Sequence, residues 1–285
     1  MGGLLRFLTG QAEHLPPEPG PAPVLPPRFV GAGAIAAGAG RPAFPLRDRY
    51  SLVARWWPTV LVVLPILVLA LAALPAAFAD RMPVAVPLAA TGAALVGSFV
   101  VRDRGLRAQK ALLAAWGGRP SERLLQWRSG APRTAVRRRH DLVKLVLGIE
   151  LPDEAAELAH SADADAAYET ATAALRERTP DRSRFPLLFQ ENLTYGFWRN
   201  AYACRAAGIA FCIASAAVTV GVARVGGAAL NRPAQVVLLA VDALLIADWL
   251  LVVTTGAVQR AAEAYAGQLF AALEFLAAGG PDRRS

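Results

Sequence analysis

Four apolar stretches, each long enough to cross a bilayer as a helix, constrain this chain more than any other feature. Pro58–Ala79 and Pro83–Val101 contain no charged side chain, and two further stretches cover about Ala201–Val225 and Gln235–Val258. A helix of about 20 residues spans the roughly 30 Å of bilayer hydrocarbon. The sequence therefore predicts an all-α integral membrane protein.

The connections within each pair of stretches are short. Asp80-Arg81-Met82 separates the first two, and a Gly- and Pro-containing loop around Asn231 separates the last two. So short a link joins antiparallel neighbours. We therefore predict two transmembrane helical hairpins, residues 58–101 and 201–258, flanking a helical cytoplasmic domain, residues 102–200.

The two ends of the chain differ in composition from the hairpins. Residues 1–57 are rich in Pro and Gly, which predicts a disordered cytoplasmic tail. Residues 259–285 are predicted to form an amphipathic cytoplasmic helix and tail that packs on the central domain or on another subunit. Its apolar residues recur at helical spacing: Ala262, Tyr265, Leu269, Leu273 and Leu276.

Local signals divide the central domain into helices. Arg102–Trp116 continues the second span and ends at Gly117-Gly118, and Thr134 is the expected cap of a helix that ends at Gly148. Pro152-Asp153-Glu154 begins another helix, with acidic side chains where the helix dipole favours them. A further helix is expected over Asp163–Thr179, before Pro180.

The distribution of basic residues predicts the orientation in the membrane. An even number of spans places both termini and the central domain on one side. Near the span ends that side has nine basic residues and the other has three, Arg81, Arg224 and Arg232. Basic residues favour the cytoplasmic side, and no signal peptide is recognisable. We therefore expect a multi-pass protein of the inner (plasma) membrane with both termini in the cytoplasm.

Motifs for enzyme chemistry do not fit the chain. Gly-x-Ser-x-Gly, the Walker lysine loop, Cys-x-x-Cys and His-Glu-x-x-His do not occur. Gly31–Ala36 has dinucleotide-binding spacing, but no strand precedes it and Pro42 interrupts the helix that would have to follow. The histidines lack metal-ligand spacing. We therefore expect no enzyme activity, no metal and no cofactor.

Nucleic acid is not expected as a partner either. The formal net charge is +8, and all but two of the 30 basic residues are arginines. The aromatic residues do not alternate with the basic ones as they do in single-strand binders.

Two aspartates inside the fourth stretch are the main candidates for function. A carboxylate in hydrocarbon costs a few kcal/mol, so Asp242 and Asp248 are expected to be paired or functional. In an antiparallel hairpin Asp242 lies level with residue 217, where Ser215 and Thr219 share a helix face and can donate hydrogen bonds. Asp248 lies nearer the cytoplasm, with Arg205 about two turns further in. A structural pairing and an ion path both remain open.

The central domain is charged unevenly. Residues 102–144 contain twelve basic and three acidic side chains, whereas residues 145–175 contain seven acidic and no basic ones. Either the acidic helices fold back on the basic ones, or a basic patch binds an anionic lipid or a small phosphorylated ligand. The patch would consist of Arg133, Arg137, Arg138 and Arg139.

The spans also predict a homo-oligomer in the lipid bilayer. Ala89, Ala93 and Gly97 recur every four residues, and such a row of small residues lets another helix approach closely. Together with the C-terminal amphipathic helix, this row offers a surface for self-association.

One segment is similar to a known family. Residues 185–200, FPLLFQENLTYGFWRN, together with Trp116-Gly117-Gly118 and Asp165-Ala166-Ala167-Tyr168, resemble a family of uncharacterised bacterial four-span membrane proteins. The resemblance covers roughly residues 105–205 and implies the same hairpin–domain–hairpin plan, without any assigned activity. The layout is also similar to that of four-span membrane effectors of nucleotide-signalled phage-defence systems.

Two functions from different classes follow from these observations. The first is a non-enzymatic membrane effector or channel gated by its cytoplasmic domain. The second is a structural or scaffolding membrane protein with no conducting role, in which the aspartates only join helices. A transporter is less favoured, because no broken-helix pair or internal repeat occurs.

Overall fold

The computed structural model describes residues 49–73, 82–225 and 230–279, and every regular element in these ranges is helical. The prediction of an all-helical chain is confirmed for them. The elements are α1 (Arg49–Ser51), the π-helix η2 (Leu52–Trp56), α2 (Trp57–Ala73), α3 (Met82–Ala115), α4 (Pro120–Arg123), the 3-10 helix η4 (Trp127–Ser129), α5 (Arg133–Leu147), α6 (Glu154–Ala159), α7 (Ser161–Arg178), α8 (Pro186–Val225), α9 (Arg232–Leu251) and α10 (Thr255–Ala277).

The helix at the start of the described chain begins earlier than predicted. Residues 49–57 were expected in the tail, but they form α1, η2 and the first residue of α2. Tertiary packing accounts for the difference, because Tyr50 and Ala54 lie against Gly196 of α8, where an added Cβ would stand 2.9 Å from the Ala54 Cβ. The rest of the predicted tail, residues 1–48, lies outside the described residues.

Gly97, one residue of the predicted row of small residues, takes part in packing between α2 and α3. A Cβ added to Gly97 would stand 2.3 Å from Thr59 Cγ2 of α2, and Thr59 is buried. Gly97 therefore serves a contact inside the chain, where it allows close approach of two helices. The side chains of Ala89 and Ala93, and the link at residues 74–81, lie outside the described part.

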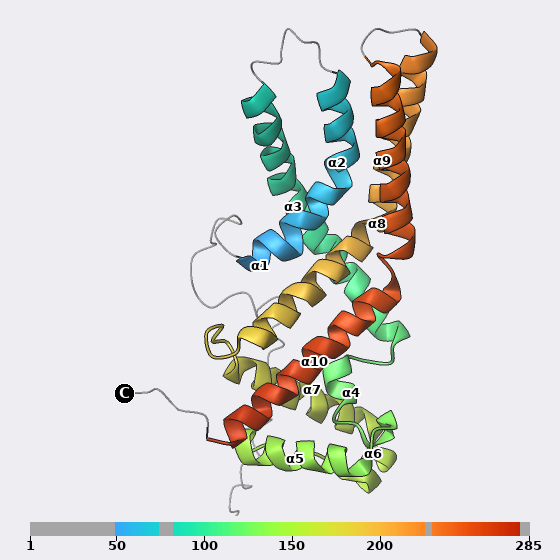
Figure 1. The fold of residues 1–285 in the computed structure, drawn as a ribbon. Helices are drawn as coiled ribbons and strands as arrows, with labels where there is room; N and C mark the ends of the chain where they lie inside the picture. The colour runs from blue at the N-terminus through green and yellow to red at the C-terminus, as the bar shows by residue number, and fades with distance from the viewer. Residues whose placement is uncertain (1–48, 74–81, 226–229, 280–285) are drawn as a thin grey trace, which may run out of the picture. The chain divides into compact units, whose positions relative to one another are not determined.

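Helix α8 connects the domain to the apolar helices without interruption. It has 40 residues, which corresponds to about 60 Å, and it packs against α2, α3, α9 and α10. Figure 1 shows it as a single gold-to-orange helix that runs beside α9 at one end and alongside α10 at the other. The predicted boundary at residue 200 therefore falls inside one continuous helix.

The last apolar helix ends earlier than predicted. The sequence suggested a span to Val258 that extends as a single helix, but α9 ends at Leu251 and α10 begins at Thr255. The Thr254 side chain accepts from the Ala257 N–H and caps α10 at 3.3 Å. The chain therefore changes direction at residues 252–254, as Figure 1 shows between α9 and α10.

Helix α10 packs on the helical domain. Its Leu269 and Leu273 are fully buried in one apolar core with Tyr168 and Leu175 of α7 and Leu125.

Local signals set the ends of the domain helices much as the sequence indicated: Gly148 ends α5 with φ 70°, and Asp153 caps α6 at 2.8 Å from the Ala156 N–H. Thr134, expected as a cap, lies inside α5.

Three helical segments of the described chain are long and apolar enough to cross a membrane: Leu52–Ala73, Pro186–Arg224 and Arg232–Leu251. Helix α3 contains the fourth predicted stretch, but most of its side chains before Gly97 lie outside the described residues. The large apolar side chains that remain exposed on these helices, such as Ile213, Val237 and Leu244, suit contact with lipid.

Candidate functional site

Asp242 lies on the buried face of α9. Leu238, Asp242 and Trp249 are the buried residues of this helix, and Asp242 is only 2% exposed. Their spacing of four and seven residues places them on one side of the helix, and α9 packs against α8 and α2. The carboxyl group is therefore enclosed by helices of the same chain.

Ser215 and Thr219, the two hydroxyl residues that were expected near Asp242, are both fully buried on α8. The Ser215 hydroxyl donates to the Pro65 carbonyl of α2 at 3.4 Å, and it lies within hydrogen-bonding reach of the Asp242 carboxyl group. Thr219 Oγ1 donates to the Ser215 carbonyl at 2.9 Å, so its hydroxyl serves its own helix. Of the two expected donors, Ser215 faces the carboxyl group.

One oxygen of Asp242 is left open. Asp242 Oδ2 is buried and has no hydrogen-bond partner among the residues that the structure describes. Leaving such a group unsatisfied costs about 1–3 kcal/mol, and buried groups of this kind call for a functional or structural explanation. At the site where α2, α8 and α9 meet, the Asp242 Oδ2 atom can therefore bind one further group: a proton, a hydrogen-bond donor or a cation.

Asp248 and Arg205 do not form an ion pair with each other in the described chain. Asp248 is exposed on α9, and the ion pairs of the described chain do not include it. Arg205 Nη2 instead donates to the Leu250 carbonyl at 3.3 Å. A cation there complements the negative end of the α9 dipole, so Arg205 stabilises the end of α9.

A buried polar junction, which sequence reasoning missed, links α8 to η2 and α3. Asn200 is fully buried, and its Nδ2 donates to the Ala54 carbonyl at 2.6 Å. Arg199 donates to Asn200 Oδ1 at 3.3 Å and to Gln109 Oε1 of α3 at 2.8 Å. A Cβ added to Gly105 would stand 1.9 Å from Asn200 Oδ1. A glycine at residue 105, in the charged part of α3, was the sequence signal that could have indicated this close contact.

The proposed anion-binding arginines are mostly engaged within the domain. Arg133 pairs with Glu154 at 2.6 Å, and Arg138 pairs with Glu274 at 3.2 Å. Arg137 is exposed. Ion pairs such as Arg133–Glu154 join the basic and acidic halves of the domain, as the fold-back interpretation of its charge layout requires.

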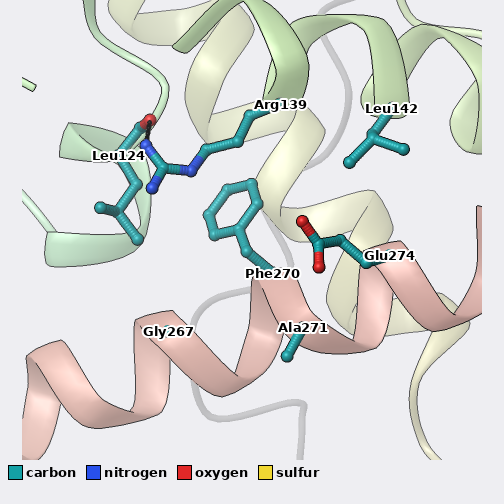
Figure 2. Close-up of a pocket in the computed structure, with 7 residues that line it drawn as sticks. All are labelled: Leu124, Arg139, Leu142, Gly267, Phe270, Ala271 and Glu274. Carbon is teal, nitrogen blue, oxygen red and sulfur yellow. Dashed lines mark hydrogen bonds between the residues drawn. The ribbon is translucent and has the colours of Figure 1, made fainter. Parts of the chain in front are cut away.

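Arg139 lines a small hollow of about 210 Å³ between α5 and α10. Figure 2 shows its guanidinium directed at the Leu124 carbonyl, to which Nη1 donates at 3.0 Å, with the Phe270 ring beside it. Burial lowers the pKa of Arg139, and Glu274 opposes this effect. The hollow therefore holds an arginine that already has partners.

Glu157 anchors the domain from a buried position. Its carboxylate accepts from the Trp127 N–H at 2.8 Å, from the Arg128 N–H at 3.2 Å and from the Tyr168 hydroxyl at 2.6 Å, and it is 3% exposed. Burial, followed by the bond to Glu157, raises the pKa of Tyr168, so the phenol keeps the proton that it donates. Glu157 therefore joins η4, α6 and α7.

A metal site does not emerge from the geometry. Within the described ranges, no group of three or more His, Cys, Asp or Glu side chains is placed to hold a metal ion.

The fold and the site define a class: a helical protein in which three of the described helices are apolar and long enough to cross a membrane, with a buried aspartate between α2, α8 and α9. No protein-family model matches the chain, and comparison with curated proteins and with solved structures finds no match. The resemblance to the four-span family therefore stays a prediction.

Proposed function

We propose that the chain is a four-span protein of the inner (plasma) membrane, with both termini and the helical domain in the cytoplasm. The spans are α2, the apolar part of α3, the second half of α8, and α9. Three helices that can cross a membrane support this plan, as does the excess of basic residues near the domain side of the spans.

Within that plan, the protein acts as a non-enzymatic membrane effector or channel that its cytoplasmic domain gates. The observation that carries this proposal is the course of α8. Leu188, near its N-terminus, lies in the domain core, and Ser215, near its other end, lies at Asp242. A ligand-dependent change in the domain would therefore move a helix that forms the α2/α8/α9 site.

Membrane potential in cells tests this proposal. A potential-sensitive dye should report collapse when the wild-type protein is expressed with its native gene neighbours. Asp242→Asn should keep expression and remove the collapse, because the amide preserves size but not charge. Asp248→Asn is the matched control on the same helix and should behave like the wild type.

The alternative is a structural or scaffolding membrane protein. Ser215 favours it, because its hydroxyl also contacts the Pro65 carbonyl and so ties α8 to α2. A scaffold predicts unchanged potential for the wild type and for both variants. Asp242→Leu should then alter only the stability of the helix bundle. An unchanged potential with the wild type would leave the scaffold as the better account.

Self-association is expected for both the effector and the scaffold. The exposed apolar faces of α8 and α9 offer surface for a second copy in the bilayer, and Asp248 lies exposed on the same helix as Val237 and Leu244. Mass photometry in nanodiscs should show a homo-oligomer, and a monomeric particle over a range of concentrations would contradict it.

A further inference from the structure

A groove lies where α9 ends and α10 begins, against the side of α8. Its volume is about 480 Å³. Glu191, Thr194 and Trp198 of α8 line one side, and Leu251 and Val252 form the end nearest α9. Arg260 and three alanines of α10 line the other side. The groove therefore joins a polar part to the end of an apolar helix.

The polar part contains one acid and one base that have no partner in the described chain. Glu191 and Arg260 take part in none of its ion pairs or side-chain hydrogen bonds, whereas Thr194 bonds to the Gln190 carbonyl of its own helix. Glu191 is half-buried and Arg260 is exposed. Opposite charges on facing walls suit a ligand that carries both signs.

The other end of the groove is apolar and open. Leu251 is 77% exposed and Val252 is 47% exposed, beside Leu250 at 45%. Three adjacent aliphatic side chains at the end of a span suit an acyl chain. The Trp198 indole belongs to the aromatic residues that favour the boundary between lipid and water.

We infer that this groove binds a glycerophospholipid with a phosphoethanolamine headgroup, an inference that rests on the proposed membrane topology. Arg260 contacts the phosphate, since a guanidinium matches phosphate geometry with paired donors. Glu191 accepts hydrogen bonds from the primary ammonium, and the acyl chain lies along Leu251 and Val252. A choline headgroup cannot donate to Glu191, and a glycerol headgroup carries no cation.

Lipid competition on the purified full-length protein tests this assignment. Equal amounts of phosphatidylethanolamine, phosphatidylcholine and phosphatidylglycerol with identical acyl chains are added in detergent, and retained lipid is counted by native mass spectrometry. The wild type should retain phosphatidylethanolamine about tenfold over the other two. Glu191→Ala removes the acceptor and should abolish the preference over phosphatidylcholine, and Arg260→Gln should lower retention of all three.

Glu263→Ala is the matched control, because Glu263 is exposed on α10 and accepts from Gln259 away from the groove. It should keep the wild-type preference. Equal retention of the three lipids by the wild type, or an unchanged preference in both groove variants, would overturn the assignment. Liposome flotation of the same preparation separates the two proposals. Protein that floats but shows no headgroup preference would rule out only the lipid site. Protein that does not float would rule out both the lipid site and the membrane topology.

Discussion

Gly208 of α8 lies directly against the indole ring of Trp249 on α9. A Cβ added to Gly208 would stand 2.3 Å from Trp249 Cε2, which is closer than real Cβ contacts allow. Trp249 is 2% exposed and belongs to an apolar core to which α2, α3, α8 and α9 contribute. The separation of α8 and α9, and with it the position of Asp242, therefore depends on the absence of a side chain at residue 208.

The first prediction follows from this contact. Gly208→Ala should lower the free energy of unfolding by about 1–3 kcal/mol, because a rigid ring must shift in a packed interface. Unfolding in mixed detergent micelles, followed by tryptophan fluorescence, measures the change. Gly221→Ala is the control on the same helix, since a Cβ there meets nothing within 4 Å. Equal stability of the two variants would show that α8 and α9 do not pack closely at this point.

The second prediction concerns the buried Glu157. Glu157→Ala should destabilise the domain by about 3 kcal/mol or more, because it removes the acceptor of several bonds to a charged group. Tyr168→Phe removes one of these donors and should cost about 1.5–3 kcal/mol. Hydrogen exchange of α6 and α7 amides in the full chain gives the free energies. If Tyr168→Phe is as damaging in the Glu157→Ala background as in the wild type, the two residues are not coupled.

The third prediction concerns pH. His140 Nε2 donates to the Leu125 carbonyl at 2.7 Å, and burial lowers the pKa of the imidazole, although this bond, Glu157 and Asp141 oppose the shift. Because the folded-state pKa lies below the unfolded value of about 6.5, the unfolded chain takes up the proton first. Stability is therefore complete above about pH 6.5 and falls as the pH drops toward the folded-state pKa.

His140→Gln keeps a donor for the Leu125 carbonyl and removes the titration. Thermal unfolding between about pH 7 and pH 5.5 should show a smaller loss of stability for this variant than for the wild type. His160→Gln, at an exposed position, serves as the control and should follow the wild type. A loss of stability that is identical in all three proteins would assign the pH dependence to other groups.

The fourth prediction concerns topology. Cys204 and Cys212 are free and buried, so a new surface cysteine gives a clear labelling signal. Ser161→Cys lies at an exposed position of the domain and should react with a membrane-impermeant maleimide only after the cells are opened. Ala228→Cys, between α8 and α9, should react in intact cells. Labelling at residue 161 in intact cells would contradict the predicted orientation.

The sequence predicted the parts of the fold that depend on local signals. Gly148 and Asp153 mark helix ends through their own backbone and side-chain chemistry, and the structure places helix ends there. The long apolar stretches likewise indicated helices, because their length and composition are properties of the chain alone. The level of Ser215 opposite Asp242 followed from counting residues in an antiparallel pair.

The remaining features depend on contacts between distant residues. Residues 49–57 are helical because they pack against α8, which begins more than 100 residues later. The bond from Asn200 to Ala54 and the bonds to Glu157 likewise join separate elements. The break at residues 252–254 was missed because only Thr254, Thr255 and Gly256 interrupt the apolar sequence there, and the capping role of Thr254 depends on the turn that it ends.

The continuity of α8 fixes the rotational phase of its two ends. An α-helix turns about 100° for each residue, so the face that Leu188 presents to the domain determines the face that Ser215 presents to Asp242. One alanine inserted after Gly208 would rotate the second half by about 100° and turn Ser215 away from the carboxyl group. Seven inserted residues complete almost two full turns and would return Ser215 to nearly its original direction, displaced by about 10 Å along the helix axis.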